Sequence, residues 1–378
     1  MNSYQIVRRG RGSIAKVPEI TEKLGIRHPL IVGSGHLTGT LLKKVPALLT
    51  APVFSEYHPN PELQDALPAV EIFRREKCDG ILSVGGGSAM DTAKAVKAIL
   101  HAGSTEDALD GRYPETMDTP HLAIPGTAGT GAEATQNAVV YLGTKKASLS
   151  HPALRPDGVI LDAELLDTLP EYHKKSAALD ALSQGIESWW SRSATEDSRV
   201  HAYLAVLGVL DNLKAYLAGD RHAAEEMMDA SFQSGKAIQI TRTTAAHAMS
   251  YMLTKRMGLA HGHACMLTLP VLWEMMQERE DMQPVLQELS SIMRLGDIRM
   301  VPKLLKGIMY DLDMPVPPMP DTKKLDELAS SVNTERLNNH PVAMTKDEIR
   351  EAYRRAMTPL CEKEKTACLD IWRYYGRE

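Results

Sequence analysis

The sequence predicts an α/β domain with a parallel sheet, followed by an all-α domain. In the first part of the chain, short apolar runs alternate with stretches of helical periodicity, the pattern of a parallel sheet with helices on its faces. From about Asp167 onward, helical periodicity dominates. The 378 residues are too many for one ordinary core, so we expect two domains, at 1–165 and 166–378.

The apolar runs are the predicted strands. They read HPLIVG, GILSV, HLAIP and DGVILD, at residues 28–33, 80–84, 121–125 and 157–162. A helix is expected at 91–100, directly after the second run. In the C-terminal part, apolar residues recur at i, i+3, i+4 and i+7 in three long segments, and a proline-rich break separates two helices. These segments are 177–191, 197–219 and 347–357, with the break at 313–321.

Composition and charge exclude several classes of protein. The 43 Lys and Arg residues against 48 Asp and Glu residues give a formal net charge of -5 without a long basic run, which argues against nucleic-acid binding. No apolar stretch is long enough for a membrane span, and the basic N-terminus lacks the apolar core of a secretory signal. The four cysteines form no C-x-x-C pair, so we expect a reduced, cytoplasmic protein.

A glycine-rich turn follows the second predicted strand. It reads Gly-Gly-Gly-Ser and leads directly into the next helix. Glycines let the backbone approach a ligand closely, and the start of a helix offers free N–H groups and the positive end of its dipole. Although the turn differs from the G-x-G-x-x-G fingerprint of dinucleotide-binding folds, we predict that it binds a pyrophosphate. The predicted binding residues are Gly86, Gly87, Ser88 and Asp91.

Two further glycine-rich turns follow the third and the first predicted strands. The turn at 125–133 adds the hydroxyls of Thr127 and Thr130, which can bond a phosphate or a nicotinamide amide. Turns of this kind at the carboxyl ends of parallel strands are where doubly wound sheets bind nucleotides. The other turn contains Gly33, Ser34 and Gly35, where many nucleotide-binding folds place an acid on the ribose 2′-hydroxyl. Because no acid stands here, we expect NADPH, with NADH as the alternative.

Four residues of the helical part could hold a divalent metal. Asp180 and Gln184 are four residues apart in a helical pattern, so their side chains share one face. His247 and His261 follow later in the chain. A carboxylate, an amide oxygen and two imidazoles suit Fe(II), Zn(II) or a similar ion. We therefore expect the helical domain to bind a metal.

These motifs together resemble the iron-containing alcohol dehydrogenase family, from the first strand to about Pro270. The resemblance implies an NAD(P)-binding N-terminal domain, a helical domain with iron or zinc, and a homodimer. It is carried by five motifs: G-G-G-S-x-x-D from Gly85 to Asp91, P-x-T-x-G-T-G-x-E from Pro125 to Glu133, D-A-L-x-x-x-I-E from Asp180 to Glu187, H-A-M from His247 to Met249, and H-G at His261 and Gly262.

The metal site departs from the family in one ligand. The family's usual ligands are one Asp and three His, and they carry over as Asp180, His247 and His261, whereas Gln184 stands where the second ligand is usually His. We expect Gln184 to be the fourth ligand because it shares the helix face of Asp180, with His263 or a water as alternatives.

The proton-handling position of the family is also altered. The family often has a histidine four residues after His247, and this chain has Tyr251 there. A phenol can donate a proton, but its reference pKa near 10 makes it a reluctant base. We predict that Tyr251 or His263 handles protons, and a chain through water or the cofactor ribose is the alternative.

Two cations precede His247 in the stretch SGKAIQITRTTAAHAMSY, where many family members have only apolar or small residues. Lys236 and Arg242 would suit the phosphonate, phosphate or carboxylate of an anionic substrate. The motifs around Gln184, Arg242 and His263 are similar to the branch of phosphonoacetaldehyde reductases. We therefore predict the metal-assisted, NADPH-dependent reduction of phosphonoacetaldehyde to 2-hydroxyethylphosphonate. The alternatives are a general alcohol or diol dehydrogenase, a sugar-phosphate cyclase that uses NAD and metal transiently, and a catalytically silent relative.

Overall fold

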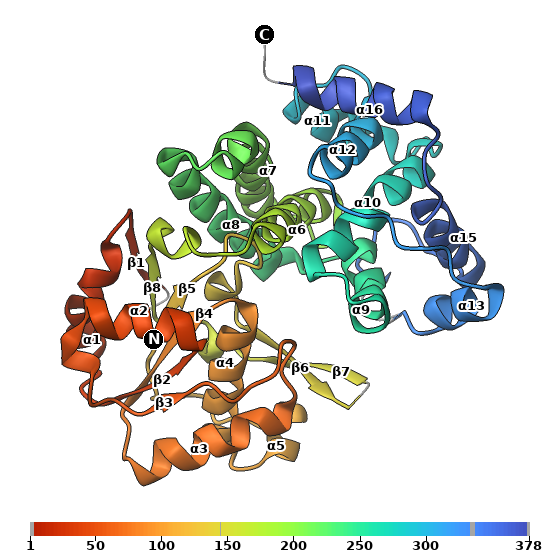
Figure 1. Ribbon diagram of the computed structural model, residues 1–378. Helices are drawn as coiled ribbons and strands as arrows, with labels where there is room; N and C mark the ends of the chain where they lie inside the picture. Colours follow the sequence, from red (N-terminus) through yellow and green to blue (C-terminus); the bar gives the residue numbers. More distant parts are fainter. Residues whose placement is uncertain (1–3, 144, 333–336, 376–378) are drawn as a thin grey trace. The chain divides into compact units, whose positions relative to one another are not determined.

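The chain forms two units in the computed structural model, which describes residues 4–143, 145–332 and 337–375. The first unit takes the chain up to Leu169 together with Gly219–Gly235, and the second takes Pro170–Ala218 together with the residues from Lys236 onward. Helix α8 (Arg221–Thr241) therefore contributes residues to both units (Figure 1).

A six-stranded parallel sheet is the centre of the first unit. Its strands follow the order β1-β8-β5-β4-β2-β3, which is the topology of a doubly wound sheet. In that order the strands are Ile6–Arg9, Gly158–Leu161, His121–Pro125, Gly80–Gly85, Pro29–Gly33 and Val53–Phe54. The four predicted strands are the four central ones, and the predicted parallel α/β architecture is confirmed.

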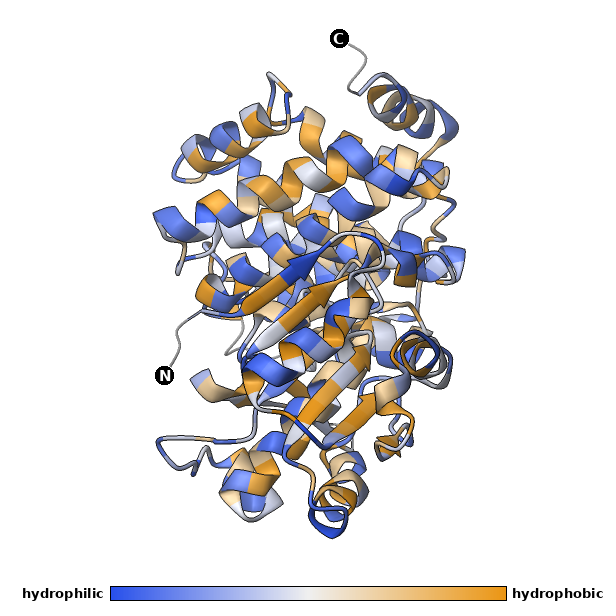
Figure 2. Ribbon diagram, turned by 90° about the vertical axis from the view of Figure 1, so that its left-hand side faces the viewer, coloured by the Kyte–Doolittle hydropathy of each residue, from blue (hydrophilic) through white to orange (hydrophobic). Residues whose placement is uncertain are grey.

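Helices cover both faces of this sheet (Figure 1). The alternation of side chains along β2 sends Leu30 and Val32 into one core and Ile31 into the other. The first core lies under α3 (Ala66–Arg75) and α4 (Gly87–Ala102), and the second under α1 (Val17–Leu24) and α2 (Gly35–Lys44). In Figure 2 the strands of the sheet are hydrophobic along most of their length, which agrees with their continuous apolar runs in the sequence. The unit also contains α5 (Thr105–Leu109).

The structure adds strands that the sequence analysis did not predict. Strand β1 is half-buried and carries two arginines, and β3 has only two residues, so neither gives a strong apolar signal. An antiparallel hairpin is formed by β6 (Asn137–Leu142) and β7 (Lys145–Ser150). Its strands mix polar and apolar residues, because only part of the hairpin faces a core.

The second unit is helical, and its described residues contain no strand. Its helices besides α8 are α6 (Glu171–Trp190), α7 (Glu196–Leu217), α9 (Ala245–Met257), α10 (His261–Gln277), α11 (Gln283–Ile292), α12 (Met300–Asp311), α13 (Thr322–Ser330), α15 (Lys346–Ala356) and α16 (Glu362–Tyr374). The central helix α6 packs against α7 and α10, and α10 packs against α9. The predicted all-α part is thereby confirmed. In the described part of the chain, no helix is both long and apolar enough to span a membrane.

Candidate active site

Three glycine-rich turns lie side by side at one edge of the sheet. They follow β2, β4 and β5, which are neighbouring parallel strands, so all three turns emerge at the carboxyl edge. The backbone N–H of Gly126 donates to the carbonyl of Gly85 at 2.7 Å, and the N–H of Ser34 donates to the carbonyl of Val84 at 3.3 Å. These bonds join the three turns into one continuous backbone surface.

Several of the glycines in these turns leave little room for a side chain. A Cβ at Gly33 would lie 2.4 Å from the Oγ1 of Thr38, and a Cβ at Gly126 would lie 2.2 Å from a methyl carbon of Leu37. A Cβ at Gly87 would lie 3.1 Å from the side chain of Thr130. Bare backbone is therefore built into this edge, as the close approach of a diphosphate requires.

The predicted cofactor residues gather around the start of α4. Gly86 is the N-cap of this helix, and no acidic residue occurs in its first turn, so the positive end of the dipole faces the turn. Ser88 lies in that first turn and its hydroxyl accepts the backbone N–H of Asn60 at 3.2 Å. Asp91 follows one turn later and is half-buried. These residues fit a pyrophosphate at the N-terminus of α4, with Thr127 facing Gly86 across the turns.

The four predicted metal ligands come together in the helical unit. The Oδ1 of Asp180, on α6, lies 3.1 Å from the Nε2 of His247, on α9. The Nε2 of His261, at the start of α10, lies 3.9 Å from the same oxygen. Gln184 lies one turn along α6, and its side chain is hydrogen-bonded to Asp180. Burial opposes ionisation of Asp180, but the two imidazoles and this amide outweigh it and lower its pKa.

Cys265 completes this group, and the sequence analysis did not identify it. One ligand atom from each of Asp180, His247, His261 and Cys265 lies within 4.8 Å of all the others. Cys265 follows His261 by one turn of α10, and this spacing was the available signal, since such residues share a helix face. Burial raises the pKa of the Cys265 thiol, but the two imidazoles outweigh burial and bring its pKa to about 7.

Glu187 fixes the orientation of the His247 ring. Its carboxylate is hydrogen-bonded to the Nδ1 of His247 and also accepts the hydroxyl of Thr244 at 2.5 Å and the backbone N–H of Ala246 at 2.8 Å. Glu187 is fully buried, and its pKa is lowered because these partners outweigh the cost of burial. The Nε2 of His247 is thus left to face Asp180. The sequence analysis quoted Glu187 in a motif but gave it no role.

Gly262 brings the helices of the site together. A Cβ at this position would lie 1.9 Å from the carbonyl oxygen of Ser176 and 2.6 Å from the backbone nitrogen of Asp180. Only glycine lets the first turn of α10 lie directly against the backbone of α6. This contact sets His261 beside Asp180, and it explains why a glycine follows the histidine.

The two residues predicted to handle protons lie in different surroundings. The ring of Tyr251 stacks on the ring of His261, with centroids 6.1 Å apart and an interplanar angle of 4°. His263 is buried, its Nδ1 lies 3.0 Å from the hydroxyl of Tyr172, and burial lowers its pKa to about 4. Among the described residues, the group of clustered metal donors does not include His263.

The two predicted substrate-binding cations occupy different kinds of position. Lys236 is half-buried within α8. Arg242 is exposed and lies one residue beyond the end of that helix, at a φ of 59°. Helical spacing therefore does not set the direction of the Arg242 side chain.

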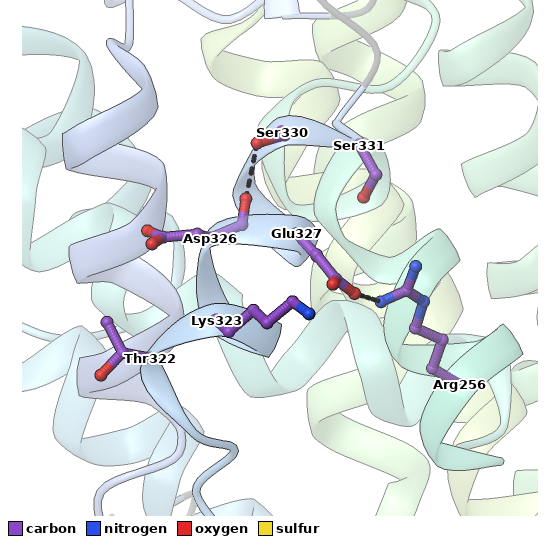
Figure 3. A pocket seen from close by; sticks show the side chains of 7 residues that line it. All are labelled: Arg256, Thr322, Lys323, Asp326, Glu327, Ser330 and Ser331. Atoms are coloured by element: carbon purple, nitrogen blue, oxygen red, sulfur yellow. Dashed lines mark hydrogen bonds and ion pairs between the residues drawn. The ribbon is translucent and has the colours of Figure 1, made fainter.

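A shallow surface hollow lies elsewhere on the helical unit (Figure 3). In it, Arg256 on α9 pairs with Glu327 on α13 at 2.6 Å. The remaining lining residues are Thr322, Lys323, Asp326, Ser330 and Ser331. None of the clustered metal donors lines this hollow, so we do not assign it to the chemistry.

Comparisons with known proteins agree with this arrangement. Residues 5–163 match the family model described as iron-containing alcohol dehydrogenase, and residues 175–357 match that of the C-terminal domain of the same family. Phosphonoacetaldehyde reductase of Streptomyces viridochromogenes is 39% identical over 227 residues, which are 56% of this chain and 57% of that protein. Long-chain-alcohol dehydrogenase 1 of Geobacillus thermodenitrificans is 30% identical over 271 residues, 67% of each chain.

The fold also matches solved structures. Sulfoacetaldehyde reductase from Bifidobacterium kashiwanohense, solved in complex with NAD+, aligns with a TM-score of 0.86 and 27% identity. The alignment covers 94% of this chain and 97% of that one. An iron-containing alcohol dehydrogenase from Thermotoga maritima aligns with a TM-score of 0.82 and 28% identity, over 93% and 98% of the two chains.

Proposed function

Because this chain belongs to the iron-containing alcohol dehydrogenase family, an oxidoreductase family acting on alcohols and aldehydes, we propose that it reduces a small anionic aldehyde with NADPH and a divalent metal. We propose phosphonoacetaldehyde as the substrate and 2-hydroxyethylphosphonate as the product. The observation that carries this proposal is the group of closely spaced metal donors formed by Asp180, His247 and His261, of which only His261 is partly exposed.

The residues of the helical unit fit a divalent ion. The donors of Asp180 and His247 are buried and that of His261 is half-buried, they lie within 4.8 Å of one another, and they include a carboxylate, which suits Fe(II) and Zn(II). An ion held there would polarise the aldehyde oxygen as a Lewis acid, and a bound nicotinamide would supply the hydride. Glu187 fixes the ring orientation of His247, and Gly262 lets His261 reach Asp180.

The turns of the first unit fit the cofactor. The bare backbone at Gly86 and Gly87 and the start of α4 would bind the pyrophosphate, and the hydroxyls of Thr127 and Thr130 are donors for the rest of the cofactor. Ser34 begins α2 where an acid would bond a ribose 2′-hydroxyl. A neutral residue there leaves the space and the charge balance for a 2′-phosphate.

The anionic substrate is supported by two relatives and by two cations. Phosphonoacetaldehyde and sulfoacetaldehyde, named for one sequence relative and one structural neighbour, are both short aldehydes with a strongly acidic group. We assign Lys236 and Arg242 to the acidic group, because a guanidinium matches the geometry of a phosphonate.

Proton delivery to the product alkoxide is assigned to Tyr251. Its ring lies against the ring of His261, next to the metal donors. A phenol can donate the proton and recover it from water. The Nδ1 of His263 adjoins the hydroxyl of Tyr172 instead. In this proposal His263 therefore exchanges protons with solvent through that hydroxyl and does not transfer a proton directly to the product.

A general alcohol dehydrogenase is the second candidate. The long-chain-alcohol dehydrogenase match covers more of this chain than the phosphonoacetaldehyde reductase match does, and a lactaldehyde reductase of Escherichia coli is 28% identical over 275 residues. Such an enzyme would use the same cofactor turns and metal donors without a requirement for an acidic group.

The deciding experiment follows NADPH absorbance in metal-loaded protein with phosphonoacetaldehyde, and with propionaldehyde as the neutral control. Fast oxidation with the first aldehyde and slow oxidation with the second supports the proposal. Equal rates would support the general alcohol dehydrogenase. No oxidation with either aldehyde, after loading with Fe(II), Zn(II) or Ni(II), would overturn both candidates.

A further inference from the structure

We propose that the Sγ of Cys265 is a protein ligand of the divalent ion, in the place that the family usually gives to a histidine at position 184. The donor set is then one carboxylate, two imidazoles and one thiolate. This inference rests on the proposed metal-dependent function, but it concerns which atoms hold the ion and can fail without it.

The first argument is the geometry of the thiol. The Sγ of Cys265 lies 3.9 Å from the Nε2 of His261, and it is hydrogen-bonded to His247 as well. It therefore adjoins both imidazoles, and it lies within 4.8 Å of the Asp180 carboxylate. An ion bound by the two histidines and Asp180 is within reach of this sulfur.

The second argument is the way the helices supply the donors. Helix α6 offers Asp180 and the residue one turn later, and α10 offers His261 and the residue one turn later. On α6 that second residue is a neutral amide, Gln184, whose side chain is already bonded to Asp180. On α10 it is Cys265. One turn after its first donor, α6 thus offers a neutral amide and α10 offers a thiol.

The third argument is that Cys265 is distinct from the other cysteines. Cys78, Cys361 and Cys368 also carry free thiols, but the clustered metal donors do not include them among the described residues. Cys265 has no exposed surface and lies among polar ligand groups. Buried cysteines usually act as small apolar residues, and contact with two imidazoles beside a carboxylate is unusual for that role.

The chemical consequence concerns the choice of metal. A thiolate is a soft ligand, which favours Zn(II) over Fe(II) relative to an all-oxygen and nitrogen site. On binding, the S–H bond of Cys265 breaks, a sulfur–metal bond forms, and the proton passes to water. Four protein ligands leave a fifth position for the aldehyde oxygen, as zinc accepts during catalysis. We expect the protein to retain zinc or cobalt more tightly than iron.

Cobalt substitution tests this ligand without any measurement of activity. The full-length protein is stripped with a chelator and loaded with Co(II), and its near-ultraviolet absorbance is recorded for a thiolate-to-cobalt charge-transfer band. Cys265→Ser should abolish the band. Cys368→Ser, which alters a buried cysteine of α16, is the matched control and should keep the band. Gln184→Ala should keep the band too.

X-ray absorption on the zinc-loaded wild-type protein makes the test independent of how the variants fold. The expected result is a sulfur neighbour at about 2.3 Å beside nitrogen and oxygen neighbours at about 2.0–2.1 Å. Stoichiometric metal with only nitrogen and oxygen neighbours, or a band that survives in Cys265→Ser, overturns the thiolate ligand and leaves the proposed function intact. Failure of the wild-type protein to bind zinc or cobalt overturns the thiolate ligand, and failure to bind Fe(II) and Ni(II) as well overturns the proposed function.

Discussion

The carboxylate of Glu187 is bonded to the Nδ1 of His247, and the Nε2 of the same ring lies 3.1 Å from Asp180. One ring nitrogen of His247 is thus held by a fully buried acid, and the other ring nitrogen points to the metal donors. A hydrogen bond of this kind fixes both the tautomer and the direction of a metal-binding histidine.

Glu187→Gln should weaken metal binding. The amide keeps the size of the side chain but loses the charge that orients His247, so metal affinity should fall about 10- to 100-fold. Titration with zinc in the presence of a competing chelator measures this. Ser188→Ala, at the next buried position of α6, is the control. A lower melting temperature with unchanged zinc affinity would show that Glu187 only supports the fold.

Gly262→Ala should separate α10 from α6. The added methyl group would overlap the backbone of α6 at Ser176, and a helix backbone cannot move aside as a flexible side chain can. Such overpacking costs about 1–3 kcal/mol of unfolding free energy. Because His261 is carried by the displaced turn, zinc affinity should fall as well.

The matched control for this variant is Gly39→Ala. Gly39 lies inside α2, and a Cβ there meets no atom of the described residues within 4 Å, so this change should stabilise by up to about 1 kcal/mol through helix propensity. Urea unfolding of both variants checks the pair. Equal stability of Gly262→Ala and the wild-type protein would refute the close approach of the two helices.

The sequence predicted the central strands because they are continuous apolar runs, and it predicted the helices because their apolar period is strong. It missed β1 and β3 because a half-buried edge strand and a two-residue strand carry little of either signal. A single boundary in the sequence does not divide the two units, because Gly219–Gly235 belongs to the first unit although it lies within the helical part of the chain.

Within the candidate site, residues that share one helix could be predicted from their spacing, whereas contacts between two helices could not. The pairing of Asp180 with Gln184 followed from a four-residue interval, and the same interval after His261 could have drawn attention to Cys265. The role of Glu187 could not be read from spacing, because it depends on how α6 packs beside α9. Spacing also could not predict the position of Arg242, which lies beyond the end of α8 at a positive φ.

Ser34→Asp should change the cofactor preference. Ser34 stands between β2 and α2, where an acid would bond the ribose of NADH and repel the 2′-phosphate of NADPH. Repulsion between two such charges should lower kcat/KM for NADPH by roughly tenfold or more, while NADH is used as well or better. Steady-state kinetics with both cofactors measure this, and Ser34→Asn is the uncharged control. Parallel losses with both cofactors would remove Ser34 from the ribose site.

Burial of His340 should lower the free energy of unfolding in mild acid relative to neutral pH. His340 is almost fully buried beside Trp190, its Nδ1 has no hydrogen-bond partner among the described residues, and burial lowers its pKa to about 4. The unfolded chain takes up the proton first, so stability falls as the pH drops from about 6.5 towards 4. The expected loss is about 3 kcal/mol.

His340→Gln should remove this part of the pH dependence. Unfolding free energies in urea, measured at intervals between pH 7 and pH 4, give the comparison with the wild-type protein. His222→Gln is the control, because the His222 side chain is 80% exposed. If the slope of stability against pH is the same in His340→Gln and the wild-type protein, burial of His340 is not the cause.

Arg242→Ala should raise KM for anionic aldehydes without changing KM for neutral aldehydes. If the guanidinium binds the acidic group, its removal costs about 1.5–3 kcal/mol, which raises KM for phosphonoacetaldehyde roughly 10- to 100-fold. KM for propionaldehyde should stay unchanged, since that aldehyde has no group for Arg242 to bind. Arg256→Ala is the matched control, because Arg256 is another exposed arginine of the helical unit and is paired with Glu327. A KM that rises equally for both aldehydes, or rises as much in Arg256→Ala, would mean that Arg242 does not select the anion.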